Sequence, residues 1–309
     1  MSIIRTPDER FTNLPDFPYE PHYVELNRIR VHYIEKGEGD VILCLHGEPS
    51  WSYLYRKMIP KLSVNHRVMA MDFIGFGRSD KYTKEEEYSF RMHCDTLIAF
   101  IRKMDLNNIT LIVQDWGGLI GLSVVGELQE RFARLVIMNT GLPTGEEKIP
   151  FSFHIWRFFA KITPVFPIGR MIYFDSARHN KTSKEIIAAY DAPFPDSSYK
   201  AGARAWPLLV PLRPGDPGTV ETKRGRDVLS RWNKPALVMF SDGDPVTRGQ
   251  EIIFRDLIPT AKDQPEIVIK NAGHFLQESH GEELAENIVN FIDRTPIKSS
   301  KKQKSRSKK

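Results

Sequence analysis

Three side chains suited to hydrolytic chemistry follow predicted strands in the order Asp115, Asp244, His274. Asp115 stands between a short apolar run, residues 110–113, and a glycine pair, after which a helical pattern of apolar residues begins. A sharp turn from strand to helix lifts one side chain above a parallel sheet, close to the positive end of the helix. An isolated aspartate at such a corner would more often cap the helix. The interpretation of Asp115 as a nucleophile therefore depends on an acid and a base that follow it in this order.

The base and the acid lie in turns after the last two predicted strands. His274 occupies a Gly-His-Phe turn directly after the strand predicted over residues 266–269. Asp242 and Asp244 both follow the strand predicted over residues 236–240, and either of them can cap the next helix. We favour Asp244 as the acid and keep Asp242 as the alternative.

A carboxylate nucleophile selects the kind of carbon that it can attack productively. Attack on a saturated carbon gives an alkyl ester, whose carbonyl water can then open, whereas a serine would give an inert ether. Because an aspartate needs no activation, His274 would serve only the second step by deprotonating the water. Asp244 would hold the imidazole in the required tautomer. Alkyl halides and epoxides are the electrophiles that fit this chemistry.

The leaving group separates these two electrophiles. A halide suits weak donors in an apolar cradle, and an indole N–H offers both. Trp116 follows the nucleophile, and Trp156 lies in a predicted helix above the site, where it can also serve simple packing. An epoxide oxygen would need acidic donors, for which the following tyrosines are available: Tyr173, Tyr190 and Tyr199.

Strands and helices alternate along most of the chain, which predicts a mostly parallel central sheet flanked by helices. A hairpin is predicted over residues 23–34, further strands over residues 41–45, 67–71, 110–113, 135–138, 236–240 and 266–269, and helices over residues 53–62, 89–104, 119–128 and 282–291. Residues 151–225 break this alternation, since they are helical and rich in aromatic residues and proline. The expected domains are a core of residues 1–143 and 226–297, an inserted helical cap of residues 144–225 and a disordered basic tail of residues 298–309.

Composition indicates a soluble globular protein. The chain has 309 residues, of which 41% are hydrophobic and 27% charged, and no apolar run reaches membrane-spanning length. Seven positive charges lie in residues 298–309, and without them the net charge of +5 falls to about −2. No basic surface with interleaved aromatics recurs in the rest of the chain, which argues against nucleic-acid binding as the main function.

The N-terminal residues contain no apolar signal segment, and two lone cysteines, Cys44 and Cys94, fit a reducing compartment. A cytoplasmic monomer is expected. The glycine-rich stretch of residues 75–80 lacks the third glycine and the following helix of a dinucleotide fingerprint, so we reject nucleotide binding there.

Together these motifs resemble the haloalkane dehalogenases of the α/β-hydrolase fold, over roughly residues 5–293. The resemblance rests on the stretches 46–56 (HGEPSWSYLYR), 72–81 (DFIGFGRSDK), 113–118 (VQDWGG), 190–196 (YDAPFPD) and 273–275 (GHF). Most α/β-hydrolases have a glycine two residues before the nucleophile. This chain has Val113 at that position, and in this respect it resembles the dehalogenases.

The resemblance implies Asp115 as nucleophile, His274 as base and Asp244 as acid. It also implies that Trp116 and, from the cap, Trp156 hold the halide, as in the subgroup whose second tryptophan comes from the cap. Backbone N–H groups of Glu48 and Trp116 would form the oxyanion hole. The implied reaction takes a haloalkane and water to an alcohol, a halide ion and a proton, with no metal and no cofactor.

Two other functions remain open from the sequence. An epoxide hydrolase would share the nucleophile, the acid and the base, and would differ in having cap tyrosines above Asp115. A binding protein that kept this fold without catalysis would be expected to lack one of the three catalytic residues, and none is missing here.

Overall fold

An eight-stranded sheet forms the centre of the computed structural model, which describes residues 2–147, 153, 157–158, 163, 167–176 and 183–297. Its strand order is β10-β9-β8-β7-β4-β5-β3-β2; β10 to β5 are mutually parallel, and β3 and β2 pair antiparallel at one edge. The strands are β2 (His22–Leu26), β3 (Ile29–Lys36), β4 (Asp40–Leu45), β5 (His66–Met71), β7 (Ile109–Gln114), β8 (Phe132–Met138), β9 (Ala236–Ser241) and β10 (Ile267–Ile269). A separate pair joins β1 (Ile3–Ile4) to β6 (Lys81–Tyr82).

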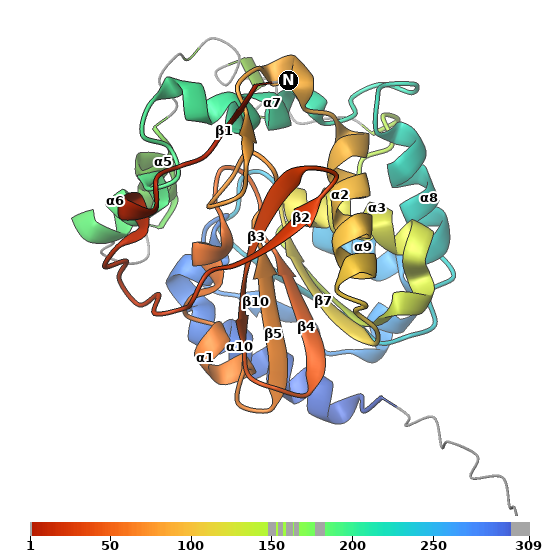
Figure 1. Cartoon of the computed structure of the whole chain (residues 1–309). Coiled ribbons are helices and arrows are strands. Elements are labelled where there is room, and N and C mark those ends of the chain that lie inside the picture. The colour runs from red at the N-terminus through yellow and green to blue at the C-terminus, as the bar shows by residue number, and fades with distance from the viewer. Residues whose placement is uncertain are drawn as a thin grey trace, which may run out of the picture.

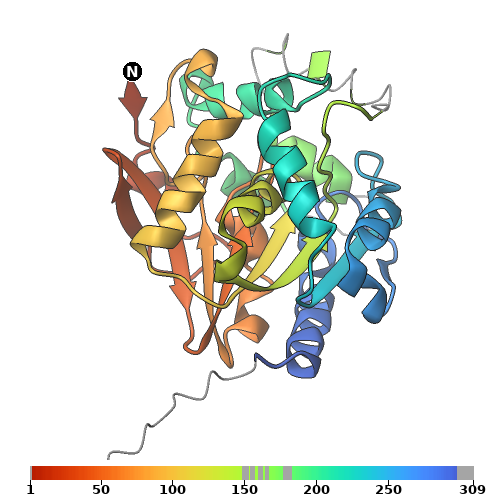
Figure 2. The same cartoon turned by 90° about the vertical axis from the view of Figure 1, so that its right-hand side faces the viewer.

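Helices cover both faces of this sheet, as the alternation in the sequence predicts (Figure 1). They are α1 (Ile59–Leu62), α2 (Phe90–Lys103), α3 (Trp116–Leu128), α5 (Ile168–Ser176), α6 (Lys184–Asp191), α7 (Ala201–Leu209), α8 (Thr219–Leu229), α9 (Gln250–Leu257) and α10 (Leu276–Arg294). Short 3-10 helices are η1 (Asp8–Phe11), η2 (Ser52–Tyr55), η3 (Glu85–Glu87), η4 (Gln129–Arg131), η5 (Ser197–Lys200) and η6 (Pro259–Asp263). Helices α2, α3 and α8 lie on one face, and α1 and α10 on the other (Figure 2).

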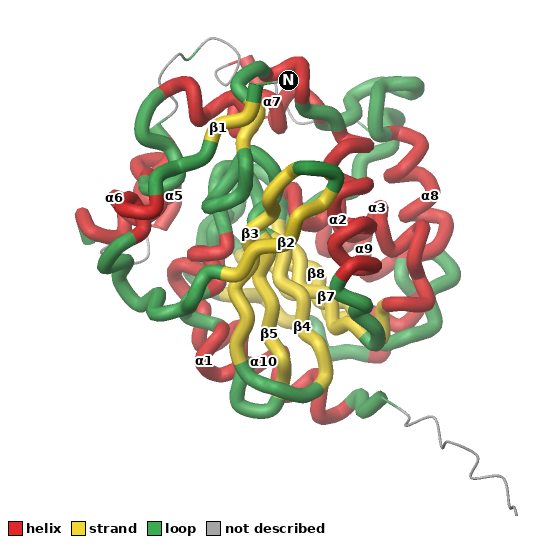
Figure 3. The backbone as a smooth tube through the Cα atoms, in the orientation of Figure 1, coloured by secondary structure: helices red, strands yellow, loops and turns green. Residues whose placement is uncertain are grey.

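The central strands have continuous apolar sequences because helices exclude water from both of their faces. All six residues of β7 are buried, and so are the last four of β4. Because these strands are parallel, their carboxyl ends meet at one edge of the sheet. Helices α5, α6 and α7 of the predicted cap lie beyond that edge (Figure 3).

Two predicted helices differ from the structure. The helix expected over residues 53–62 is two short pieces, η2 and α1, because Pro60 lacks an amide hydrogen and starts a new helix in its first turn. The last helix begins at Leu276 rather than at residue 282. Its first turns lack the apolar spacing of an amphipathic helix, because they bury two polar residues, Gln277 and Glu278. The helix also kinks at His280.

Helix α8 crosses the predicted cap boundary at residue 225. It packs along α3, and glycines permit the close approach: a Cβ at Gly225 would lie 2.8 Å from the carbonyl oxygen of Leu122, and a Cβ at Gly126 would lie 2.8 Å from the amide nitrogen of Gly225. The whole of α8 therefore belongs to the helical layer over the sheet (Figure 2). The predicted basic tail, residues 298–309, and much of the predicted cap lie outside the described residues.

Candidate active site

Asp115 occupies the sharp turn between β7 and α3. Its backbone has φ 50° and ψ −124°, a conformation that residues other than glycine rarely adopt. The turn is held by the Asp115 amide, which donates to the Asn139 carbonyl at 2.9 Å, and by the Gly118 amide, which donates to the Asp115 carbonyl at 2.9 Å. The Asp115 side chain makes no hydrogen bond to the first turn of α3, so it does not act as a helix cap. The turn instead directs the carboxylate into a pocket.

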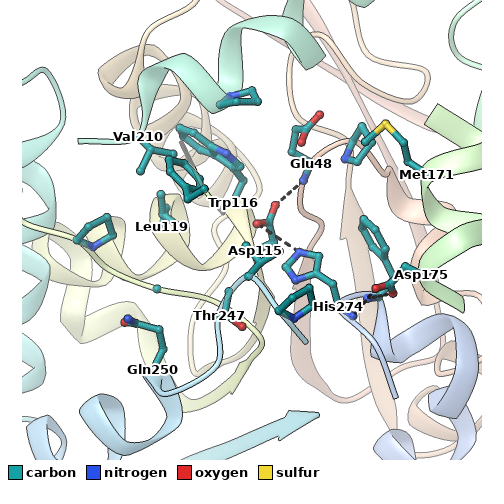
Figure 4. Close-up of a pocket in the computed structure, with 18 of the residues that line it drawn as sticks. Glu48, Asp115, Trp116, Leu119, Met171, Asp175, Val210, Thr247, Gln250 and His274 are labelled. Atoms are coloured by element: carbon teal, nitrogen blue, oxygen red, sulfur yellow. Dashed lines mark hydrogen bonds and ion pairs between the residues drawn. The ribbon is translucent and has the colours of Figure 1, made fainter. Parts of the chain in front are cut away.

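Both carboxylate oxygens of Asp115 have a partner. Oδ1 accepts the backbone N–H of Glu48 at 2.7 Å, and Oδ2 lies 3.5 Å from Nε2 of His274 (Figure 4). Gly47 allows the loop after β4 to pass this close, because a Cβ there would lie 2.4 Å from the Cβ of Asp115. The loop after β4 and the turn after β10 thus meet at the predicted nucleophile.

The imidazole of His274 also contacts one of the two predicted acids. Its Nδ1 lies 2.9 Å from Oδ2 of Asp244, a side chain that is 1% exposed. Asp244 additionally accepts hydrogen bonds from the backbone N–H of Val246, at 2.7 Å, and from the hydroxyl of Thr247. Asp242 has a side chain 36% exposed, and its carboxylate lies 3.9 Å from Nζ of Lys270. The geometry is that of a carboxylate, an imidazole and a second carboxylate in a row.

The charges of this row shift the pKa values of its members. Burial alone would lower the pKa of His274, but the carboxylates of Asp244 and Asp115 raise it well above its usual range. Burial would raise the pKa of Asp244, yet the charge and hydrogen bond of His274 hold it below its usual value. The two carboxylates thus stabilise the protonated form of the imidazole.

The side chain of Glu48 differs from these carboxylates. It lines the pocket, is 6% exposed, and its Oε1 is buried without a hydrogen-bond partner among the described residues. Burial, and next to it the negative charge of Asp115, raise the pKa of Glu48 well above its usual range. The pocket therefore favours the protonated form of Glu48, a property that the sequence does not predict.

A cavity of about 440 Å³ opens above Asp115. Its wall is mostly apolar and includes Leu119, Phe153, Met171, Val210 and Phe275, in addition to Trp116. None of its described lining residues is a tyrosine. Of the three cap tyrosines considered as epoxide donors, Tyr190 donates its hydroxyl to Glu278 at 2.6 Å, and neither Tyr173 nor Tyr199 lines the cavity.

Trp116 is 3% exposed and stands beside the predicted nucleophile at the cavity wall. A second indole, Trp206 of α7, stacks on it with ring centroids 4.9 Å apart, but the N–H of Trp206 donates to Nε2 of His93 at 2.6 Å. Trp206 therefore supports Trp116 and does not present its own N–H to the cavity. The other predicted halide ligand, Trp156, lies outside the described residues.

Comparison with known proteins places the chain in a family. Residues 40–281 match the family model of the alpha/beta hydrolase fold. The chain is 48% identical over 304 residues to a haloalkane dehalogenase of Psychrobacter cryohalolentis. The alignment covers 96% of this chain and 100% of that protein. This chain belongs to the haloalkane dehalogenase family. Haloalkane dehalogenase 1 of Mycobacterium tuberculosis H37Rv is another relative, 45% identical over 303 residues and covering 96% of this chain and all of that protein.

Solved structures of haloalkane dehalogenases share the fold. The haloalkane dehalogenase DpaA from Paraglaciecola agarilytica NO2, described as tetrameric, superimposes with a TM-score of 0.88 at 36% identity, covering 93% of this chain and 97% of DpaA. These findings confirm the predicted α/β-hydrolase fold and the family resemblance. Within the described residues, no helix of this dehalogenase is long and apolar enough to cross a membrane. The same residues contain no cluster of His, Cys, Asp or Glu side chains suited to a metal ion.

Three polar residues around the predicted base, His274, are not evident from the sequence. Gln114 and Asn139 donate their side-chain amides to the carbonyl oxygen of His274 at 3.3 and 3.1 Å. Asp175 accepts the backbone N–H of the same residue from the opposite side. Asn139 did carry a signal, because it directly follows the parallel strand β8 beside the site. Asp175 carried none, since it lies 99 residues before His274.

Proposed function

We propose that this dehalogenase converts a 1-haloalkane and water to a primary alcohol, a halide ion and a proton through an alkyl ester of Asp115. One observation carries the proposal: an ionisable carboxylate faces an apolar cavity, with a backbone donor on one oxygen and the His274 imidazole beside the other. No base is needed to activate this nucleophile, so the first step depends on alignment and on stabilisation of the departing halide.

In the first step, one oxygen of Asp115 displaces halide from the saturated carbon. We assign the attack to Oδ2, because Oδ1 is held by the Glu48 amide and is placed to become the ester carbonyl oxygen. The departing halide takes the bonding electron pair and is bound by the indole N–H of Trp116. Trp156 of the cap remains the proposed second halide ligand, on the strength of the family resemblance.

In the second step, water attacks the ester carbonyl. Esterification removes the negative charge of Asp115, one of the groups that raise the pKa of His274, so that pKa falls. An imidazolium then releases its proton to solvent, which leaves Nε2 free to act as a base. His274 then deprotonates the water while Asp244 stabilises the imidazolium that results. The oxyanion is held by the backbone N–H groups of Glu48 and Trp116. As the tetrahedral intermediate collapses, the His274 imidazolium gives its proton to the departing alkoxide, which leaves as the alcohol. The carboxyl group of Asp115 then releases the second proton of the water, and the carboxylate is restored.

The epoxide hydrolase alternative has less support. It requires acidic hydroxyls above Asp115, and no tyrosine is among the described residues of the cavity wall. A binding protein without catalysis is also disfavoured, because nucleophile, base and acid are all present in contact with one another.

Mass spectrometry of the His274→Phe variant after incubation with 1-bromobutane tests the reaction directly. We expect a stable butyl adduct on the peptide that contains Asp115, and bromide release by the unmodified protein. Styrene oxide serves as the matched electrophile. An ester formed at Asp115 from styrene oxide, with neither adduct nor bromide from 1-bromobutane, would assign the chemistry to an epoxide hydrolase.

The assembly and location of the enzyme are also proposals. We propose a monomer, testable by light scattering as a particle near 35.6 kDa, with a tetramer like that of DpaA as the contrary result. A cytoplasmic location is supported by two buried, unpaired cysteines, Cys44 and Cys94. Cell fractionation tests that location.

A further inference from the structure

A cap residue holds the backbone of the catalytic turn. Asp175, near the end of α5, accepts the backbone N–H of His274 on Oδ1 and that of Phe275 on Oδ2, both at 2.8 Å. These partners lie 99 and 100 residues further along the chain. Figure 4 shows the Asp175 carboxylate beside the base, across from the core residues of the site.

The Asp175 carboxylate accepts two backbone N–H groups, which a neutral side chain would bind less well. The two amides immediately precede α10, whose N-cap residue, Phe275, supplies no side-chain hydrogen bond. Amides at the start of a helix lack partners within the helix, and a negative charge near them is favourable. Gly273 permits the approach, because a Cβ there would lie 2.5 Å from Oδ1 of Asp175.

The base is thus held from two sides. Two core residues, Gln114 and Asn139, bind its carbonyl oxygen, whereas Asp175 of the cap binds its amide. The imidazole must align with Asp244 and with the ester at Asp115 during the second step only. A loss of the cap contact would therefore act on that step.

We propose that Asp175 is a positioning residue that aligns His274 for hydrolysis of the alkyl ester and so couples docking of the cap to the second half of the reaction. This inference rests on the proposed function. Asp175 also lines the cavity, but both of its carboxylate oxygens accept backbone N–H groups, so alkylation of Asp115 would proceed without it. Since misplacement by about 1 Å can cost on the order of 100-fold in rate, we expect ester hydrolysis to slow by about 10- to 100-fold when the carboxylate is removed.

A purely structural role makes a different prediction. Met171 and Phe174 line the cavity from the same helix as Asp175, so a displaced α5 would change substrate binding and alkylation as well. The control is Asp191→Asn. Asp191 holds α5 from its other end, through the backbone N–H of Gly169 at 2.9 Å, and does not contact the catalytic turn.

Rapid-quench mass spectrometry with 1-bromobutane separates the two steps. In Asp175→Asn we expect alkylation within about twofold of the unmodified rate and accumulation of the butyl ester, because one carboxylate oxygen is replaced by an N–H donor. Asp191→Asn should accumulate no ester. Gly273→Ala is a second variant that crowds the Asp175 carboxylate without changing its charge, and it should also accumulate the butyl ester. It tests the proposal independently if Asp175→Asn folds poorly.

Alkylation and hydrolysis that fall together, or a change in KM alone, would overturn the proposal. So would hydrolysis at the unmodified rate in a folded Asp175→Asn variant. The absence of any adduct in His274→Phe would instead show that the proposed function is wrong, so the two failures can be told apart.

Discussion

Trp206 donates its indole N–H to Nε2 of His93 at 2.6 Å, in a cluster that is closed to solvent. Because Nε2 must carry a lone pair to accept this bond, His93 is neutral. Burial lowers the pKa of His93 to about 3. The stack of Trp206 on Trp116 thus depends on an imidazole that must stay unprotonated.

This neutrality predicts a loss of stability in acid. In the unfolded chain a histidine binds a proton below about pH 6.5, whereas folded His93 binds it only near pH 3. The folded state is therefore penalised as pH falls through this window, by about 1.4 kcal/mol per pH unit. Urea unfolding at pH 7, 6 and 5 should show a shallower decline for His93→Gln, whose side-chain oxygen can accept the Trp206 N–H. Parallel curves for the two proteins would contradict the prediction.

A second prediction concerns Glu48, which lines the cavity together with the proposed nucleophile. Because the pKa of Glu48 is raised well above its usual range, Glu48→Gln should keep kcat within about twofold at pH 7. At higher pH, ionised Glu48 would add a negative charge near His274, keep the imidazole protonated and slow ester hydrolysis. The alkaline decline of kcat should therefore be weaker in the variant. A 100-fold loss at pH 7 would mean that Glu48 acts as a carboxylate.

The two candidate acids give a matched pair of variants. Asp244→Asn should slow ester hydrolysis on the order of 10³-fold or more, because the imidazole loses its orienting carboxylate. Asp242→Asn should change kcat little, since its carboxylate is partly exposed and remote from the imidazole. Steady-state bromide release measures both. The reverse order would exchange their roles.

A buried ion pair between Arg56 and Glu278 should matter for stability. The guanidinium donates to both oxygens of Glu278, at 2.7 and 2.6 Å, and the hydroxyl of Tyr190 donates to Oε2. Glu278→Gln would leave a buried, uncompensated cation, at a cost of about 3–5 kcal/mol in the free energy of unfolding. Glu286→Gln is the control on the same helix, because its pair with Lys61 is exposed and worth under about 1 kcal/mol. Chemical denaturation of both variants should show this difference; equal effects would refute it.

The sequence was sufficient where function follows the ends of strands. Asp115 and His274 are found next to continuous apolar runs, and parallel strands bring such ends to one edge. One local signal was misinterpreted: the apolar spacing of residues 53–62 suggested one helix, but Pro60 divides it. Contacts between distant segments leave no local pattern. Asp175 has no local signal at all, because its function depends on how a cap helix docks against a turn 100 residues away.

The contact between Gly126 and Gly225 bears on any attempt to build chimaeras from this enzyme and its relatives. A cap transplanted with its end at residue 225 would bring half of α8 with it and would require a foreign helix to fit against α3. A junction at Gly218, before α8 begins, leaves that interface native. Exchange of the cap between relatives would then change only the residues that line the cavity. The helix that replaces α5 must carry an acceptor for the amides of His274 and Phe275.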